Sequence, residues 1–403
     1  MTIIGRPRSA QRPLRVAVML DLQWPFKRHT EIFAGVQRYA VAHGWESIVD
    51  EFAHDTLRRR RDAEGAYDGV VARATRALAR CAAELGVPVV NVWPSSPARQ
   101  LLPGVFPDST ETGRLIAEHL LARGFRAFAT LTSPLNIDNE AEIAEFSRLV
   151  REAGFECLSS NIPQDTHRDL AHWRKTVRLI EGAMNRWTPP VGVYVGQEIC
   201  GRIVVQAGQR RGWRIPEDVA IVAGKNQETL CEQPRPSLTS VEVGYDRIGY
   251  AAAELLDRLM HGQQPPPAPI RLVPHGVVVR ESTDFFAVDH AVVAAALAFI
   301  AANSHSRIGP DDVAAAVGTE TRTLQNYFQH AIQRPIATEI RRVRIERAKR
   351  ELVQSDRSLT AIARAVGFGT IQRLYEIFRR ELGVSPGEYR KQRQLRSATD
   401  SRP

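Results

Sequence analysis

The sequence predicts two α/β lobes followed by an all-α domain that carries two helix-turn-helix motifs. From Leu14 to Asp284, short apolar runs alternate with helical patterns of about 15 residues. This alternation predicts parallel sheets with crossover helices, and about ten such units are too many for one small sheet. Beyond Asp284 the strand pattern stops, and Ala-rich and Arg-rich helical patterns follow. We therefore expect an α/β domain over residues 14–285 and a helical domain over residues 288–394.

Strands in the α/β part are expected where a short apolar run is bounded by turn residues. The predicted strands are residues 15–20, 68–72, 87–93, 126–132, 191–195, 218–224 and 237–243, with strand-like sequence also at 270–282. The predicted helices are residues 30–43, 76–85, 140–153, 170–185, 199–211 and 246–260. A further strand and helix are expected within residues 104–124, where Asp108 or Ser109 is placed to cap the helix.

One predicted strand ends in a polar segment. The apolar run from Val219 to Ala223 is followed by Lys225 and Asn226, in the sequence AIVAGKNQETL. In open parallel sheets, ligands bind beyond the carboxyl ends of the strands. We therefore expect Lys225 and Asn226 to face a ligand-binding cleft between the two lobes.

Composition limits the class of protein. Apolar residues make up 43% and charged residues 25%, which are ordinary globular values. The four cysteines have no paired spacing, which favours a reduced cytoplasm. The N-terminal apolar run from Val16 to Leu20 is too short for a signal-peptide core or a membrane span. We expect a cytoplasmic protein with no membrane partner, no metal and no cofactor.

The formal charge of +9 is concentrated in the helical part. From Asp289 onward the chain has 19 Lys and Arg and 12 Asp and Glu, a net +7, which leaves +2 for the first 288 residues. Concentrated positive charge suggests a polyanionic partner, most simply nucleic acid. On charge alone, a solvated basic surface is the alternative.

Two stretches of the helical part resemble each other: DVAAAVGTETRTLQNYF at residues 312–328 and AIARAVGFGTIQRLYEIF at residues 361–378. Each contains a short apolar helix, an AVG turn and a second helix with inward Leu and Phe. Glycine at the turn permits two helices to pack at a steep angle. The repeat predicts helix-turn-helix motifs at about residues 310–329 and 359–382.

The second helix of each motif exposes side chains suited to base recognition. Arg, Gln and Asn side chains make bidentate contacts to base edges in the major groove. Glu376 either accepts from a cytosine amino group or pairs with Arg380 four residues later, and pairing is favoured. The candidate base contacts are Thr321, Arg322, Gln325, Asn326, Thr370, Gln372, Arg373 and Glu376.

A helix over residues 335–355 is expected to join the two motifs, with Pro335 at its start. At about 1.5 Å per residue it spans roughly 31 Å, close to the roughly 34 Å between successive major-groove faces. Such a spacer places both recognition helices on one side of a duplex, so double-stranded DNA is the expected partner. The candidate phosphate contacts are Arg341, Arg342, Lys349, Arg350 and Arg380.

The segment SLTAIARAVGFGTIQRLYEIFRRELGVSPGEYR, residues 358–390, resembles the signature of AraC-type transcription regulators. The segments VFPDSTETGRLIAEHLLARGFRAFA, RGWRIPEDVAIV and PSLTSVEVGYDRIGYAAAELL resemble the LacI-type, periplasmic-binding-protein-like effector domain. A sensor followed by an AraC-type reader is the arrangement of the xylose operon regulator group, which the chain resembles over nearly its full length. The resemblance implies a two-lobed sensor that closes on a small molecule and a reader of adjacent major grooves. It also implies dimerisation through the sensor, and contact with RNA polymerase if the protein is an activator.

The resemblance also places the ligand site, and there the sequence departs from the family pattern. The family has an Asn-Asp pair where this chain has Gln197 and Glu198, and an acidic residue where it has Lys225. Because an ammonium in place of a carboxylate reverses the hydrogen-bond polarity, we hypothesise that Lys225 contacts an anionic ligand group, as in a sugar acid. The alternative is an internal pair of Lys225 with Glu198 or Asp21. The candidate ligand-binding residues are Asp21, Gln23, Trp24, Asp108, Gln197, Glu198, Lys225 and Asn226.

Two other classes of protein are weighed against a ligand-controlled regulator. An enzyme is not expected, because no GxSxG, HExxH, GxxxxGK or GxGxxG stretch occurs in the sequence. A DNA-binding dimer whose sensor has lost its ligand is the second alternative. It predicts DNA protection that no metabolite changes.

Overall fold

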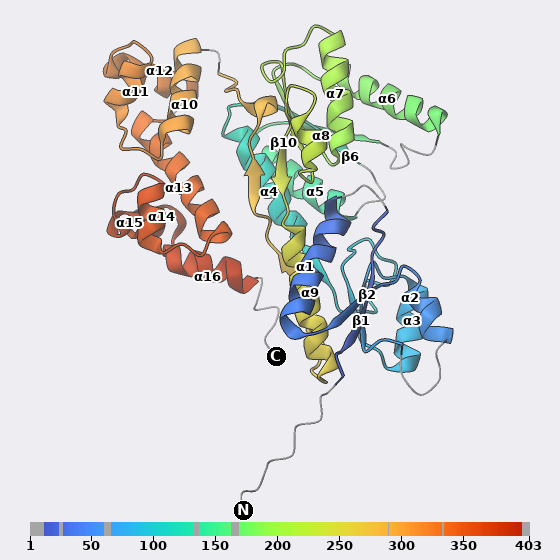
Figure 1. The fold of residues 1–403 in the computed structure, drawn as a ribbon. Coiled ribbons are helices and arrows are strands. Elements are labelled where there is room, and N and C mark those ends of the chain that lie inside the picture. Colours follow the sequence, from blue (N-terminus) through green and yellow to red (C-terminus); the bar gives the residue numbers. More distant parts are fainter. Residues whose placement is uncertain are drawn as a thin grey trace, which may run out of the picture. The chain divides into compact units, whose positions relative to one another are not determined.

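The computed structural model confirms an α/β part followed by an all-α part (Figure 1). It describes residues 12–23, 27–59, 66–132, 137–162, 169–288, 290–332 and 334–396. The last element of the α/β part, the 3-10 helix η1 (Glu281–Thr283), is followed by α10, which begins at Ala291. Two compact units divide the chain: residues up to Pro107 together with Gly244–Leu272, and Asp108–Val243 together with the segment from Val273 onward.

The first unit contains a parallel four-stranded sheet in the order β2-β1-β3-β4. Its strands are β1 (Arg15–Met19), β2 (Glu46–Val49), β3 (Gly69–Ala72) and β4 (Val89–Asn91), and its helices are α1 (Lys27–His43), α2 (Ala53–Arg59), α3 (Arg76–Leu85) and α9 (Tyr245–Met260). A second parallel pair joins β5 (Val105–Pro107) to β11 (Ile270–Leu272). Every residue of the central strand β3 is buried, as expected for a parallel strand covered on both faces.

Helices α1 and α9 of the first unit cross with their backbones in contact. A Cβ atom added to Gly35 would lie 1.9 Å from the carbonyl oxygen of Asp246, and one added to Gly249 would lie 1.9 Å from that of Ile32. Only glycine permits this approach, because it lacks a Cβ atom. This crossing fixes α9, which is distant in sequence, against the first sheet's own helix.

The second unit contains a six-stranded sheet in the order β12-β10-β9-β8-β6-β7, in which β12 pairs antiparallel and the other pairs are parallel. Its strands are β6 (Ala127–Thr132), β7 (Cys157–Asn161), β8 (Val191–Val195), β9 (Val219–Ala223), β10 (Thr239–Glu242) and β12 (Gly276–Val278), and its helices are α4 (Ser109–Leu121), α5 (Ile137–Glu152), α6 (Leu170–Met184), α7 (Glu198–Arg210) and α8 (Glu228–Glu232). Alternate residues of β8 enter different apolar cores: Val193 belongs to one and Tyr194 to the other. The sheet is therefore covered on both faces, as its continuous apolar strands predict.

The edge strands β2 and β7 are not predicted from the sequence. Their sequences, ESIV and CLSSN, contain only partly buried and exposed residues. Such strands carry no continuous apolar run from which they could be predicted, unlike the buried edge strand β4. The short helices α2 and α8 are missed as well.

The helical part consists of α10 (Ala291–Asn303), α11 (Pro310–Ala316), α12 (Thr321–Ile332), α13 (Ile336–Gln354), α14 (Leu359–Ala365), α15 (Ile371–Leu382) and α16 (Pro386–Arg396). Helices α11 and α12 lie at the first expected helix-turn-helix motif, and α14 and α15 at the second. Helix α13 contributes to two separate apolar cores, with Ile336 and Ile340 in the first and Ile345 and Leu352 in the second. One continuous helix thus joins two small bundles, each built around one motif.

Candidate ligand site and nucleic-acid interface

In the second unit, Lys225 follows β9 and is held by two carboxylates. Its ammonium group forms an ion pair with Glu142 of α5, and its backbone N–H donates to Oε1 of Glu198 at 2.6 Å. The internal partner expected from the sequence was Glu198 or Asp21, and that choice of partner is wrong. The reason is geometric: Glu198 starts α7 and turns its carboxylate to the backbone after β9, which leaves the ammonium group to α5.

Glu142 is the buried centre of this group. Its side chain is 1% exposed, and it accepts a hydrogen bond from the hydroxyl of Tyr194 as well as the ammonium group of Lys225. Glu198 is also buried and accepts a second, longer bond from the backbone N–H of Gln227 at 3.4 Å. The ammonium group of Lys225 is therefore paired within the protein with the buried carboxylate of Glu142.

Asn226 is buried and has a φ of 50°. Its Nδ2 donates to Glu242 at 2.7 Å, and its Oδ1 accepts from Ser240 and from Arg280, both at 2.8 Å. Asn is among the few residues that tolerate this left-handed conformation. These bonds connect the end of β9 to β10 and to the segment before η1. The amide of Asn226, which was expected to contact a ligand, therefore forms hydrogen bonds within the protein.

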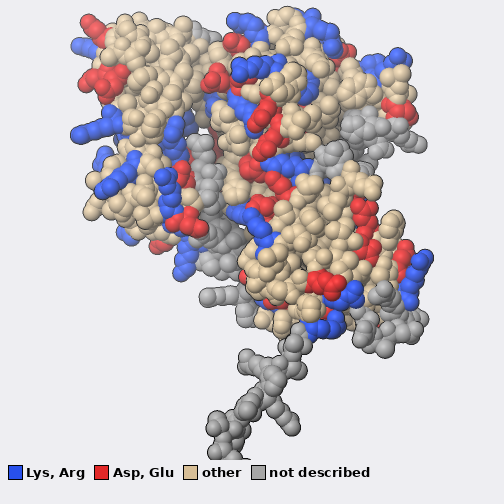
Figure 2. Space-filling model, viewed as in Figure 1, with Lys and Arg blue, Asp and Glu red and all other residues tan. Residues whose placement is uncertain are grey.

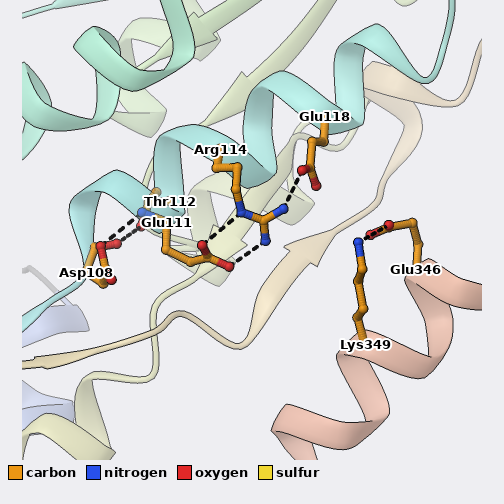
Figure 3. Close-up of polar contacts among 7 residues, drawn as sticks. All are labelled: Asp108, Glu111, Thr112, Arg114, Glu118, Glu346 and Lys349. Carbon is orange, nitrogen blue, oxygen red and sulfur yellow. Dashed lines mark hydrogen bonds and ion pairs between the residues drawn. The ribbon is translucent and has the colours of Figure 1, made fainter. Parts of the chain in front are cut away.

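Two candidate ligand residues lie at the starts of helices. Asp108 caps α4, because its Oδ1 accepts from the backbone N–H of Glu111 at 3.0 Å (Figure 3). The cap expected from the sequence is thus confirmed. Gln197 precedes α7 and makes no capping bond with its partly buried side chain. A ligand contact by either residue stays a prediction.

In the first unit, Asp21 and Gln23 follow β1, and Trp24 lies outside the described residues. The backbone oxygen of Asp21 accepts from Nδ1 of His29 at 2.5 Å. Burial lowers the pKa of His29 below its ordinary value of 6.5, so the ring is neutral at pH 7. The neutral ring therefore anchors the turn after β1 without adding charge, while Gln23 is exposed.

Two further side chains lie at the carboxyl end of the same sheet. Arg73 follows β3 and Trp93 follows β4, and the guanidinium carbon lies 3.9 Å from the centre of the indole ring. Burial lowers the pKa of Arg73, the charge of Arg28 acts in the same direction, and Asp21 acts against them. Arg73 and Trp93 are not among the candidate residues selected from the sequence. Their positions could have suggested them, because Arg73 comes directly after a predicted strand, in VVAR, as Lys225 does, and Trp93 is the last residue of another, in VVNVW.

The first recognition helix, α12, presents the expected polar face. Its apolar side is buried, whereas Arg322 and Asn326 are exposed. Gln325 is partly buried, and its Oε1 accepts from the backbone N–H of Ile336 at 3.4 Å, which links α12 to α13. Thr321 donates to a carboxylate of α11 at 2.6 Å. Arg322 and Asn326 are therefore the side chains of this helix best placed to reach bases.

The second recognition helix, α15, is capped by Thr370, whose hydroxyl oxygen accepts from the backbone N–H of Arg373 at 3.3 Å. Gln372 and Arg373 are exposed. Glu376 pairs with Arg373 at 2.8 Å and lies 4.0 Å from Arg380. The expected pairing of Glu376 with Arg380 is present at this longer distance, and Arg380 lies closer to Glu381, at 2.8 Å.

Among the expected phosphate contacts, Arg342 is part of an internal ion pair. It lies 2.6 Å from Glu339, which also pairs with Arg334 at 2.7 Å and is itself buried. Burial opposes the ionisation of Glu339, but the hydrogen bonds and charges of Arg342 and Arg334 outweigh it and hold the pKa of Glu339 below its ordinary value. Arg342 therefore stabilises the start of α13 in this structure.

Two other basic residues of α13 also lie near carboxylates. Arg341 lies 3.5 Å from a carboxylate of α15, and Lys349 lies 2.7 Å from Glu346 on its own helix (Figure 3). The side chain of Arg350 lies outside the described residues. Figure 2 shows Lys and Arg side chains spread over the helical part with acidic side chains between them. The positive charge is thus distributed over a surface.

Another arginine of α13, Arg344, joins the two bundles of the helical part. Its guanidinium donates to the backbone oxygens of Ser304 at 2.8 Å, Ser306 at 2.9 Å and Ile308 at 3.2 Å. Gly367, in the turn of the second motif, has a φ of +88°, and a Cβ atom there would lie 2.2 Å from the oxygen of Ser304. The turn of one motif therefore packs directly against the loop that precedes the other.

Comparisons with known proteins agree with this division. A model described as a periplasmic binding protein-like domain matches residues 117–283, and one described as a helix-turn-helix domain matches residues 313–392. The chain is 24% identical to the xylose operon regulatory protein of Escherichia coli (strain K12), over 93% of this chain and 96% of that protein. It is 26% identical to the xylose operon regulatory protein of Haemophilus influenzae, over 72% of this chain and 74% of that protein.

Among solved structures, the xylose-binding transcription activator xylR matches with a TM-score of 0.56 and 21% identity, over 94% of this chain and 98% of that one. The two-part resemblance expected from the sequence is confirmed: a stretch that matches a periplasmic binding protein-like domain precedes one that matches a helix-turn-helix domain. In the part of the chain that the structure describes, no helix is long and apolar enough to cross a membrane. Over the same residues, no group of three or more His, Cys, Asp and Glu side chains is arranged to hold a metal ion.

Proposed function

We propose that this chain is a sequence-specific DNA-binding transcription regulator controlled by a small carbohydrate-like effector. The observation that carries the proposal is the pair of helix-turn-helix bundles joined by α13. Each bundle exposes side chains of the types that read base edges, Arg322 and Asn326 in one and Gln372 and Arg373 in the other. The relatives are named as regulatory proteins, which supports this function and a chain that is not an enzyme.

The effector is proposed to bind at the carboxyl ends of the strands in the α/β part. Periplasmic-binding-protein-like sheets present polar side chains there, and this chain places Arg73, Trp93 and Lys225 after three of its strands. The solved relative is described as xylose-binding. For this chain we propose a sugar or sugar acid other than xylose, since Lys225 and Gln197 change the polarity of the site.

The regulator is proposed to act in the cytoplasm as a homodimer that pairs through its α/β part, on the operator or promoter of a sugar-catabolism operon. If it is an activator, RNA polymerase is a further partner. Two-fold symmetry would be matched by two copies of the binding sequence in the DNA.

A second candidate function is a DNA-binding dimer with a degenerate sensor. The observation that favours it is the internal use of Lys225 and Asn226, whose side chains bond to Glu142 and to Glu242, Ser240 and Arg280. Footprinting on a selected site separates the two candidates. Protection that changes with a sugar supports the sensor, whereas protection that no sugar changes, with an intact dimer, supports the degenerate form.

The DNA-binding function is tested by selecting bound duplexes from a random-sequence library with the full chain. We expect a bipartite consensus with two recognised segments about one helical turn apart. Affinity for the consensus should exceed that for scrambled DNA by about 1000-fold or more at physiological salt. Equal affinity for both DNAs would contradict the proposal.

A further inference from the structure

We infer that residues 283–288, through which the chain enters the helical part, form a packed joint that transmits effector binding at Asn226 to the DNA-binding bundles. The positioning residue of this joint is Arg123, which follows α4. This inference rests on the proposed function and names the regulation of its effector site. Two observations support it: the packing of the joint, and a chain of buried hydrogen bonds that leads from the joint to Asn226.

The side chains of the joint alternate between two apolar cores. Phe285 and Ala287 pack against a core on one face of the six-stranded sheet. Phe286 is buried in the core of the first helix-turn-helix bundle, and Val288 packs against that same core. Because neighbouring residues are anchored in different cores, the joint cannot rotate without exposing apolar surface on one of its sides. It therefore differs from a flexible linker, which has no such anchors.

Arg123 holds the joint at three of its residues. Its Nε donates to the backbone oxygen of Thr283, and its own backbone oxygen accepts from the N–H of Ala287 at 2.7 Å. Its guanidinium carbon lies 5.6 Å from the ring centre of Phe286, which is within cation–π range. One arginine at the end of α4 therefore fixes both the backbone of the joint and its buried aromatic side chain.

A chain of hydrogen bonds runs from Arg123 into the sheet. A guanidinium only donates, so Nδ1 of His119 accepts from Nη1 of Arg123 at 3.2 Å, and Nε2 of His119 donates to the hydroxyl of Thr283 at 2.9 Å. The hydroxyl of Thr283 lies 2.7 Å from that of Thr239. Oγ1 of Thr239 accepts from the backbone N–H of Arg280 at 2.8 Å and donates to the backbone oxygen of Arg280 at 3.1 Å. Because both threonines are completely buried, water does not compete for these bonds.

The far end of this chain of bonds is the candidate effector residue Asn226. Its Oδ1 accepts from Nη2 of Arg280 and from the hydroxyl of Ser240. An amide oxygen has two lone pairs, so an effector hydroxyl that donates to it displaces one of these donors. Displacement of Arg280 shifts the residue whose backbone holds Thr239, and thereby the bond from Thr239 to the joint. An effector that makes this contact favours one arrangement of the bonds over the other, which is what transmission requires.

The packing of the joint is tested by hydrogen–deuterium exchange of the full chain, without DNA or sugar. We expect the amide of Ala287 to exchange about 100-fold or more slowly than in an unstructured peptide, because it is bonded and packed. Arg123→Gln should speed this exchange by about tenfold, and Arg123→Lys by less. Arg126→Gln, which changes an exposed arginine three residues further along the chain, is the matched control and should leave it unchanged. Fast exchange of Ala287 in the wild type overturns the joint.

Transmission is tested by the DNA affinity of the full chain on the selected duplex, with and without D-xylose, D-glucose, D-galactose, D-glucuronate or D-galacturonate. We expect at least one sugar to change the wild-type affinity about fivefold or more. Thr283→Val keeps the branched shape of the side chain but removes the hydroxyl between His119 and Thr239. It should bind that sugar as the wild type does, measured by calorimetry, and lose the change in DNA affinity. Thr130→Val, which removes a buried hydroxyl of β6 that bonds to Ser159, is the matched control and should keep the change.

Each outcome supports or overturns the inference. A sugar response that survives in Thr283→Val and in Arg123→Gln, with melting temperatures that match the wild type, overturns transmission through these bonds. An equal loss of response in Thr130→Val overturns the specific role of Thr283. If no sugar changes the wild-type DNA affinity, effector control fails and transmission fails with it, whereas selective DNA binding and the exchange of Ala287 are each decided by their own measurement.

Discussion

The ammonium group of Lys225 forms an ion pair with the carboxylate of Glu142. The carboxylate is almost completely shielded from solvent, because Glu142 is buried. The two residues are 83 positions apart in the chain and come from β9's end and from α5. The pair supplies an internal counter-charge to a lysine at a strand end. It also makes the stability of the second unit depend on this lysine.

Replacing Lys225 with Met should destabilise the chain by about 3 kcal/mol, because a buried carboxylate loses its counter-charge. Urea denaturation followed by tryptophan fluorescence measures the change. Lys175→Met, at an exposed position of α6, is the control and should have little effect. The double variant Lys225→Met/Glu142→Gln should recover part of the loss, since residue 142 then carries no buried charge. A single variant as stable as the wild type would refute the structural role of the pair.

Two glycines of the second helix-turn-helix turn provide a matched comparison. Gly367 and Gly369 have φ values of +88° and +78°, but a Cβ atom at Gly367 would lie 2.2 Å from the oxygen of Ser304, whereas one at Gly369 meets nothing within 4 Å. Gly369→Ala should cost about 1 kcal/mol from the left-handed backbone alone. Gly367→Ala should cost about 3 kcal/mol, because overpacking is added. Thermal denaturation of the two variants measures the difference, and equal melting temperatures would contradict the close packing of the two bundles.

Stability of the helical part should fall in acid because of Glu339. Its pKa is lower in the folded chain than its ordinary value of 4.5, since Arg342 and Arg334 stabilise the carboxylate against the cost of burial. A depressed carboxyl pKa contributes stability above the unfolded value, and this contribution is lost as pH falls through the folded value. In Glu339→Gln, the melting temperature should be lower than the wild type at pH 7 and should decline less from pH 5 to about pH 3. Parallel wild-type and variant curves over that range would exclude this carboxylate as a source of acid sensitivity.

Arg373 and Arg341 should differ in how they affect DNA binding. Arg373→Ala should cost about 1–3 kcal/mol on the selected duplex and relax selectivity at one base pair, because its exposed side chain faces the bases in the proposed complex. Arg341→Ala should weaken binding to all sequences alike and reduce the slope of affinity against salt by about one ion. Fluorescence anisotropy with single-substitution duplexes measures both effects. Arg174→Ala, an exposed arginine of α6, is the control. If Arg373→Ala lowers the affinity for all duplexes equally, Arg373 contacts the DNA phosphate backbone and not a base.

The sequence predicted the regular elements well where burial is high. The fully buried strands β3, β8 and β9 appear as continuous apolar runs, and all three were located. The helix-turn-helix pairs were located because each has an AVG turn followed by a helix whose inward Leu and Phe are four residues apart. The edge strands β2 and β7 were not predicted, since their half-exposed residues form no continuous apolar run.

The partners of charged residues could not be predicted in the same way. For Lys225 the sequence offered carboxylates that also follow strands, but α5 supplied the partner. For Glu376 the partner expected from helical spacing, Arg380, lies 4.0 Å away, whereas Arg373 lies closer, at 2.8 Å. Ion pairs of this kind depend on side-chain directions and on distances of a few ångströms, which periodicity does not encode.

By itself, the sequence determined that two α/β lobes precede a pair of helix-turn-helix motifs, because apolar periodicity and glycine positions record which faces must be buried. Only the tertiary structure decided which polar groups form hydrogen bonds and ion pairs within the protein. It engaged Lys225 with Glu142 and Asn226 with Arg280, and it brought Arg73 onto Trp93. The physical reason is that burial is a property of each element, whereas charge balance depends on which elements meet.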